Sequence, residues 1–166
     1  AIVSNPDKRI SEFSLLTASE LRQLTLDWNQ TEAEYPDDQC VHELFEEQAE
    51  RNPNAVAVIF EHEQLTYAQL NAKANQLAHY LRKMGVKPET VVGVCIERSL
   101  EMIIGILGIL KAGGVYLPID PSYPEERKAF LLADGAPLVL LTQTALLRAM
   151  PIDDIECICL DRDWSL

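Results

Sequence analysis

Four short runs of apolar residues, alternating with helix-length segments, constrain the fold of this chain more than any other feature. The runs are Val91–Ile96, Val115–Ile119, Leu138–Leu141 and Ile155–Leu160. Strands that are apolar on both faces are typical of a parallel sheet that helices cover on both sides. The sequence therefore predicts an α/β fold with a mostly parallel sheet flanked by helices.

The segments between these runs have the length and the end signals of helices. We expect helices from Tyr67 to about Met84, over Leu100–Ala112 and over Pro124–Ala133, and a short one over Thr144–Met150. In Leu100–Ala112, Gly105 and Gly108 weaken the helix, which makes sense where another element packs closely. Further upstream, Ala55–Phe60 and Gln64–Thr66 flank a short polar turn and predict a β-hairpin.

The first part of the chain has a different character. Thr17-Ala18-Ser19-Glu20 is a capping box that predicts a helix with Leu21, Leu24 and Trp28 along one face. Asn29 to Gln39 is polar and acidic, and we interpret residues 1–39 as an interdomain linker with one helix. A second helix then begins a domain at residue 40, with these residues expected on its buried face: Val41, Leu44, Phe45, Gln48 and Ala49.

Two motifs are explained by helix ends. In Leu65-Thr66-Tyr67-Ala68-Gln69-Leu70, Thr66 and Gln69 form a capping box and Leu77 continues the buried face of the helix that follows. In Leu110–Asp120, Gly113 is expected to end a helix in the left-handed conformation, with Lys111 as a single charge near the helix end. A phosphate loop needs the order strand, glycine loop, helix, and Gly113-Gly114 follows a helix instead.

The charge balance excludes some partners. Lys and Arg number 14 and Asp and Glu number 26, so the net charge is 14 − 26 = −12. Such a chain repels phosphate backbones and anionic bilayers, so we expect neither a nucleic-acid nor a membrane partner. No signal peptide or 18-residue apolar run occurs, which suits a cytoplasmic protein.

The sequence shows no catalytic or cofactor-binding constellation and no metal-ligand pattern. We expect reduced, buried thiols at the four cysteines (Cys40, Cys95, Cys157 and Cys159). His42, His62 and His79 are scattered and expected at the surface. Glu125 and Glu126 begin a helix and are expected in solvent, and a plain charged loop accounts for the three residues Asp161, Arg162 and Asp163.

The motifs taken together resemble a known family. Leu65–Leu70 resembles the first core motif of nonribosomal peptide synthetase adenylation domains, with Gln69 where the family usually has Glu, and Leu110–Asp120 resembles the second. Three more stretches are similar to the same family: Val41–Phe45, Gly93–Met102 and Asp120–Arg127. Residues 1–39, with Arg9-Ile10-Ser11 and Trp28-Asn29, resemble the linker that joins a condensation domain to an adenylation domain.

The resemblance implies an enzyme that reacts an amino acid with Mg-ATP to an aminoacyl adenylate and loads it onto a phosphopantetheine thiol. The partners it implies are an upstream condensation domain and a downstream carrier domain, and it leaves a small helper protein as an option. Residues 40–166 would be the N-terminal portion of the adenylation domain, truncated before the phosphate loop. Because the chain begins at Ala1 and ends at Leu166, we expect it to be an excerpt that carries no catalytic residue.

Two other functions compete with this interpretation. An acyl-CoA synthetase or a luciferase-like enzyme shares the fold and the adenylation step but not the amino-acid substrate. The linker and the Asp120–Arg127 run favour the peptide synthetase. A non-catalytic interaction module is the other alternative. The sequence that follows the chain would distinguish it from an enzyme, because a Ser/Thr/Gly-rich loop before Lys-Gly indicates an enzyme.

Overall fold

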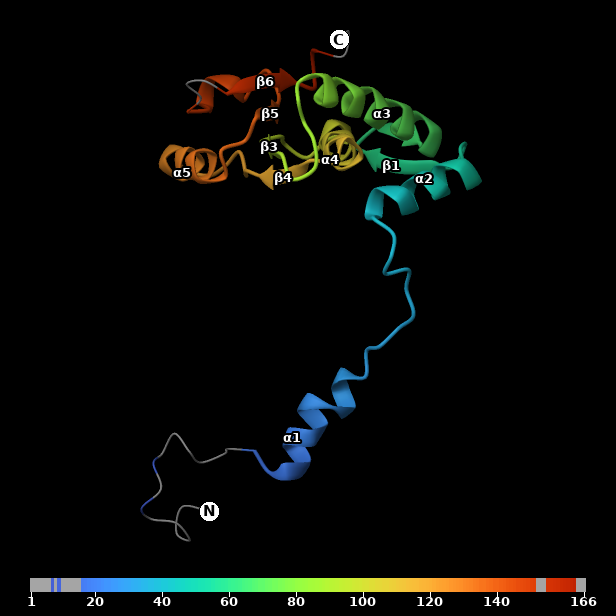
Figure 1. Cartoon of the computed structure of the whole chain (residues 1–166), viewed down its shortest axis with the longest axis vertical. Coiled ribbons are helices and arrows are strands. Elements are labelled where there is room, and N and C mark those ends of the chain that lie inside the picture. The colour runs from blue at the N-terminus through green and yellow to red at the C-terminus, as the bar shows by residue number, and fades with distance from the viewer. Residues whose placement is uncertain (1–6, 8, 10–15, 152–154, 164–166) are drawn as a thin grey trace. The chain divides into compact units, whose positions relative to one another are not determined.

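The computed structural model describes residues 7, 9, 16–151 and 155–163, and the chain divides into two units, Ala1–Asp38 and Gln39–Leu166 (Figure 1). We treat each unit by itself. The expectations that concern Ile10 and Ser11 lie outside the described residues.

The first unit contains the helix that its capping box predicts. α1 spans Ala18–Thr25, and a short 3-10 turn, η2, spans Asp27–Asn29. The backbone N–H of Thr17 donates to Glu20 Oε2 at 2.7 Å, and the N–H of Glu20 donates back to Thr17 Oγ1 at 3.3 Å. The apolar side chains that follow the cap, Leu24 and Trp28 among them, are exposed.

A four-stranded parallel sheet forms the centre of the second unit, as the sequence predicts. Its strands are β3 (Val91–Val94), β4 (Val115–Pro118), β5 (Val139–Thr142) and β6 (Glu156–Cys159), in the order β4-β3-β5-β6. Every pair of neighbours is parallel. The connections after β3 and after β5 lead in opposite directions along the sheet, so the two strands define a topological switch point.

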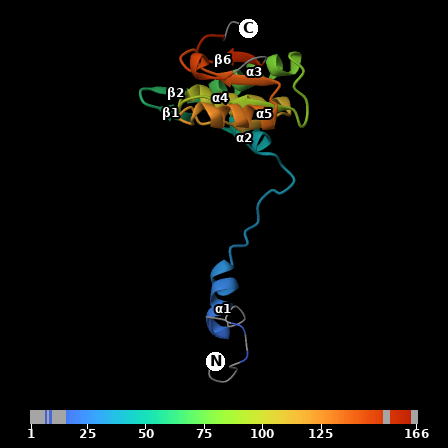
Figure 2. The ribbon, with the colours of Figure 1, turned by 90° about the vertical axis from the view of Figure 1, so that its left-hand side faces the viewer.

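Helices cover the sheet from both sides (Figures 1 and 2). α3 (Tyr67–Lys83) and α4 (Leu100–Ala112) pack on one face, where Val139 and Leu141 join their core. α5 (Glu125–Gly135) packs on the other face against Leu140, in a cluster that also contains Cys95. The alternation of Val139, Leu140 and Leu141 between two cores is the reason why this run is apolar throughout.

The edge strand β4 departs from the prediction that the apolar strands are buried on both faces. Val115 is 44% exposed and Tyr116 is 41% exposed, whereas all four residues of β5 are buried. β4 has a hydrogen-bonded neighbour on one side only, whereas β5 lies between β3 and β6.

A hairpin and a helix complete the unit. β1 (Val56–Phe60) and β2 (Glu63–Thr66) form the predicted antiparallel pair, and α2 spans Val41–Arg51. The predicted buried face of α2 is wrong at its start. Val41 is 66% exposed, while Phe45 packs on Tyr67 with ring centroids 5.8 Å apart and Ala49 is buried.

The predicted helix over Thr144–Met150 is also wrong. Only a single 3-10 turn, η3, forms at Leu147–Ala149. The backbone N–H of Thr144 donates to the Asp161 carboxylate at 2.9 Å, which fixes the start of the segment to another loop. Pro151 follows the segment, and the residue before a proline is disfavoured in the helical region.

Two helices meet at a glycine, as expected from its position. A Cβ atom on Gly108 of α4 would lie 2.7 Å from Leu77 Cδ2 of α3, too close for any side chain without movement. α4 begins after Ser99, whose side chain accepts from the N–H of Met102, and ends at Gly113 with φ +89°. The sequence therefore predicted both the ends of α4 and the reason for Gly108.

Thr66→Ala is expected to lower the free energy of unfolding of the second unit by about 0.5–2 kcal/mol. The Thr66 hydroxyl accepts from the Gln69 N–H at 3.3 Å, and Gln69 Oε1 accepts from the Thr66 N–H at 2.9 Å. Urea denaturation followed by circular dichroism measures the change. Thr66→Ser keeps the hydroxyl and is the matched control; an equal loss in both variants would contradict the capping interpretation.

Candidate functional site

The loops at the carboxyl edge of the parallel sheet are where an open α/β fold places its ligands. In this chain they are held together by side chains that accept hydrogen bonds from backbone N–H groups. Gln143 Oε1, after β5, accepts from the N–H of Glu97, after β3, at 2.9 Å. Because β3 and β5 define the switch point, this bond fixes the loops on its two sides.

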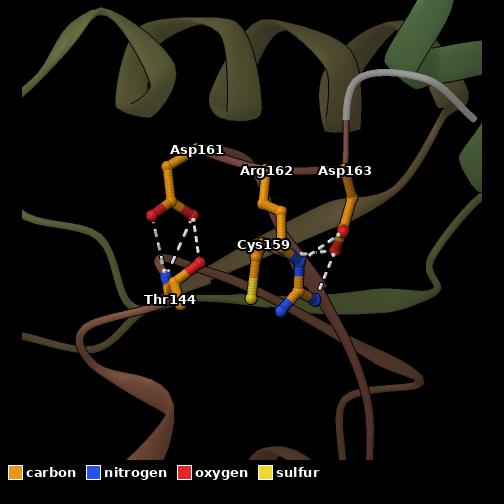
Figure 3. A network of polar contacts seen from close by, with 5 residues as sticks. All are labelled: Thr144, Cys159, Asp161, Arg162 and Asp163. Atoms are coloured by element: carbon orange, nitrogen blue, oxygen red, sulfur yellow. Dashed lines mark hydrogen bonds and ion pairs between the residues drawn. The ribbon is translucent and has the colours of Figure 1, made fainter.

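The loops after β5 and β6 are joined by a polar network (Figure 3). Asp161 Oδ1 accepts from the N–H of Thr144 at 2.9 Å and from the Thr144 hydroxyl at 3.1 Å. Asp163 accepts from Arg162 Nε at 2.8 Å and from the N–H of Cys159 at 2.9 Å. The Arg162 guanidinium and then the Cys159 N–H lower the pKa of Asp163. The sequence predicted a plain charged loop at Asp161–Asp163. In the structure this loop is ordered, and it is hydrogen-bonded to the loop after β5 and to the end of β6.

The loop after β4 is folded around Asp120. Its Oδ1 accepts from the Ser122 hydroxyl at 2.7 Å and from the Ser122 N–H at 2.8 Å. These bonds, the hydroxyl first, lower the pKa of the Asp120 carboxyl, and the charge of Arg98 contributes further. Glu125 and Glu126, which follow, are exposed as predicted.

A hollow of about 780 Å³ lies beside these loops. Its apolar side is formed by β3, α4 and β4, and its polar rim by Glu97, Arg98 and Asp120. The residues that line it on the apolar side are Val94, Ile96, Met102, Ile106, Tyr116, Pro118, Ile119 and Leu146. The size is within the range of ligand pockets, about 300–1,000 Å³.

A buried cation that sequence reasoning missed lies at the opposite, amino edge. Lys111 was expected as a single charge at the helix end, yet its side chain is only 4% exposed. Its Nζ forms an ion pair with Glu46, donates to Asn71 Oδ1 at 2.8 Å and lies 5.8 Å from the centre of the Phe45 ring. The available signal was a lysine in a helix that is apolar on nearly every face.

A second basic side chain caps the same helix. Arg82, in the last turn of α3, donates to the backbone oxygen of Lys111 and, at 3.5 Å, to that of Ala112. Carbonyl groups in the last turn of a helix lack partners within it, and a guanidinium satisfies two of them at once. Arg82 and Lys111 therefore join α2, α3 and α4.

Three carboxylates of the described loops already have hydrogen-bond donors as partners. Asp120, Asp161 and Asp163 each accept hydrogen bonds from neighbouring groups. Within the described ranges no cluster of three or more His, Cys, Asp or Glu side chains is arranged to hold a metal. Over the same ranges, no helix combines the length and the apolar character needed to cross a bilayer.

The four cysteines differ in exposure, which corrects one expectation. Cys95 and Cys159 are buried and Cys157 is half-buried, but Cys40, at the start of α2, is exposed. Burial raises the pKa of the Cys95 and Cys159 thiols, so little nucleophilic thiolate forms there at neutral pH. Of the three histidines, His62 and His79 are exposed as expected, and His42 is half-buried.

Cys40 is expected to be the first thiol of the folded chain to react with a maleimide at neutral pH, with Cys95 and Cys159 unmodified at the same time. Peptide mapping by mass spectrometry after a short pulse measures the order. The chain unfolded in guanidinium, in which all four thiols react, is the control. Early modification of Cys95 would show that the sheet core opens more readily than its burial indicates.

Comparison with known proteins gives a consistent match. Residues 45–165 match the family described as AMP-binding enzyme. The chain is 53% identical over 163 residues to one of the linear gramicidin synthase proteins of Brevibacillus parabrevis, an alignment that covers 98% of this chain and 3% of that protein. The chain thus spans about a thirtieth of the length of this curated relative.

Solved structures show the same fold. The AMPPNP-bound form of the nonribosomal peptide synthetase FmoA3 superposes with a TM-score of 0.76 at 35% identity, over 82% of this chain and 15% of that chain. The N-terminal subdomain of NpsA from Klebsiella oxytoca superposes with a TM-score of 0.66 at 26% identity, over 74% of this chain and 32% of that one.

Proposed function

Because this chain belongs to the AMP-binding enzyme family, we propose that it is part of the amino-acid-activating adenylation domain of a nonribosomal peptide synthetase. The observation that carries the proposal is the 53% identity to a linear gramicidin synthase protein over 98% of this chain. Within that segment, residues 1–39 would be the linker from an upstream condensation domain and residues 40–166 the N-terminal portion of the adenylation domain. The division of the structure at Asp38 supports a boundary near that position.

The parent protein would form an aminoacyl adenylate from an amino acid and ATP, and would then load it onto the phosphopantetheine thiol of a carrier domain. The AMPPNP-bound relative supports a nucleotide substrate. We assign the phosphate loop, Mg²⁺ binding and the chemical steps to other parts of the parent. The role of this segment would be structural, because it forms a four-stranded parallel sheet of the domain.

The alternatives are less well supported. The relatives described above are peptide synthetases, which favours an amino-acid substrate over that of an acyl-CoA synthetase or a luciferase-like enzyme. The 53% identity to a peptide synthetase over 98% of this chain favours a segment of an enzyme over a non-catalytic interaction module.

The parent protein is expected to catalyse amino-acid-dependent exchange of pyrophosphate into ATP. A panel of the common amino acids, each tested with Mg-ATP and labelled pyrophosphate, measures the activity and selects the substrate. A matched panel of fatty acids is the control for the acyl-CoA synthetase alternative. Exchange that depends on a fatty acid and on no amino acid would refute the proposed function.

A further inference from the structure

The helix α2 is attached to the second unit by few apolar side chains. Of its 11 residues only Ala49 is buried. Phe45 is half-buried and packs against the core that α3 and α4 form, whereas Val41 and Leu44 are 66% and 37% exposed. Segments with few buried apolar contacts open at a lower free energy than the core of a protein does. The apolar contacts of α2 therefore place it among the less stable parts of the unit.

The hydrogen bonds at the start of α2 do not attach it to the other helices. The backbone N–H of Cys40 donates to Glu43 Oε2 at 2.7 Å, and Gln39 Nε2 donates to Glu47 Oε1 at 2.7 Å. Both bonds join residues of α2 to the residues just before it. They stabilise the beginning of the helix and leave its attachment to contacts with α3 and α4.

The polar attachment of α2 comes from the Lys111 side chain. Its Nζ forms an ion pair with Glu46 of α2 and donates to Asn71 Oδ1 of α3 at 2.8 Å, and it lies 5.8 Å from the centre of the Phe45 ring. Hydrogen bonds between charged groups are roughly twice as strong as those between neutral ones. The bond to Glu46 is therefore a large part of what holds a helix with a single buried residue.

The backbone of Lys111 is fixed independently of α2. Arg82 of α3 donates to the backbone oxygens of Lys111 and Ala112, which ties the end of α4 to α3. The base of the Lys111 side chain thus belongs to the α3–α4 pair, and only its ammonium group reaches α2. Because of this arrangement, α2 can move away from Lys111 without separating α3 from α4.

We propose that α2 opens as a unit of its own, and that the Lys111–Glu46 ion pair is the latch that controls this opening. α2 follows the boundary between the two units at Asp38, so it is the element through which residues 1–38 are joined to the second unit. The latch therefore controls the attachment of the joining helix. This inference is independent of the proposed function, because it concerns contacts within the described chain.

Amide hydrogen exchange of the 166-residue chain, followed residue by residue by NMR, tests the proposal. Glu46→Gln removes the charge and keeps an acceptor of the same size, and Glu50→Gln makes the same change at an exposed site of the same helix. We expect Glu46→Gln to accelerate exchange at residues 45–51 by at least about tenfold, with the amides of α4 unchanged. Glu50→Gln is expected to change exchange by less than about twofold.

A second variant separates a latch from a simple need for a counter-charge. Adding Asn71→Asp to Glu46→Gln gives Lys111 a carboxylate partner again, but on α3 instead of α2. If the bond between helices is what matters, exchange in α2 stays fast in this double variant. Recovery of the slow exchange in α2 would overturn the proposal, because a carboxylate on either helix would then be sufficient.

Two results with Glu46→Gln alone would also contradict the proposal. Unchanged exchange at residues 45–51 would show that the apolar contacts of Phe45 and Ala49 hold α2 without the ion pair. Equal acceleration in α2 and in α4 would show that α2 opens only when the whole unit unfolds. The amides of α4 thus report on the folding of every variant in the same sample.

Discussion

Leu77→Asp is expected to abolish the cooperative unfolding transition of the second unit. Leu77 is 4% exposed and lies in the contact between α3 and α4, where its side chain fills the space over Gly108. An aspartate there would be an ionised group without a partner in an apolar core, which costs several kcal/mol. Since a domain of this size is stable by only about 5–15 kcal/mol, the loss is comparable with the total.

The thermal midpoint followed by circular dichroism measures this effect. His79→Asp is the matched control, because it introduces the same residue on the same helix two positions away, at an exposed site. The control is expected to change stability by less than about 0.5 kcal/mol. A midpoint for Leu77→Asp close to that of the unmodified chain would show that the buried face of α3 is wrongly assigned.

Residues 1–166 alone are expected to show no amino-acid-dependent exchange of pyrophosphate into ATP. Adenylation requires hydrogen-bond donors, a metal ion and a carboxylate substrate held in one geometry, and this alignment provides much of the rate. At the carboxyl edge, the carboxylates of Asp120, Asp161 and Asp163 are already bonded to Ser122, Thr144 and Arg162, respectively. At the amino edge, Lys111 is bonded to Glu46 and Asn71.

The exchange assay is run on the chain alone, on the chain mixed with the remainder of the parent, and on the intact parent. A boiled sample gives the background, and a far-ultraviolet circular dichroism spectrum shows that the chain is folded in the assay. Exchange by the chain alone above the boiled sample would show that catalytic groups lie within residues 1–166. Exchange by the intact parent is the positive control.

Local signals in the sequence were sufficient for the helix ends and for the class of fold. The capping boxes at Thr17 and Thr66 formed because their hydrogen bonds join residues three positions apart. α4 begins after Ser99 and ends at Gly113 for the same kind of reason, since an N-cap and a left-handed glycine act within one turn. The runs of apolar residues predicted a parallel sheet because strands buried on two faces cannot alternate with polar residues.

Predictions failed where the outcome depends on the presence or absence of contacts with distant parts of the chain. Val41 continues the apolar stripe of α2, but nothing in the described part of the second unit covers it, and it is exposed. Thr144–Met150 has a helical pattern, but its first N–H group bonds to Asp161, and only a 3-10 turn remains. The exposure of Val41 and the short 3-10 turn both depend on the positions of elements that are distant in sequence. A local sequence pattern carries no information about those positions.

The sequence by itself therefore determined the elements of this protein, their order and their family, because hydrogen bonds within one turn and apolar periodicity are local properties. Only the tertiary structure decided which polar groups meet. Lys111 pairs with Glu46, 65 positions away, and Asp161 binds Thr144 across two strand ends. The exposure of Val115 and Tyr116 on β4 belongs to the same class, because the cover of an edge strand depends on chain that is distant in sequence.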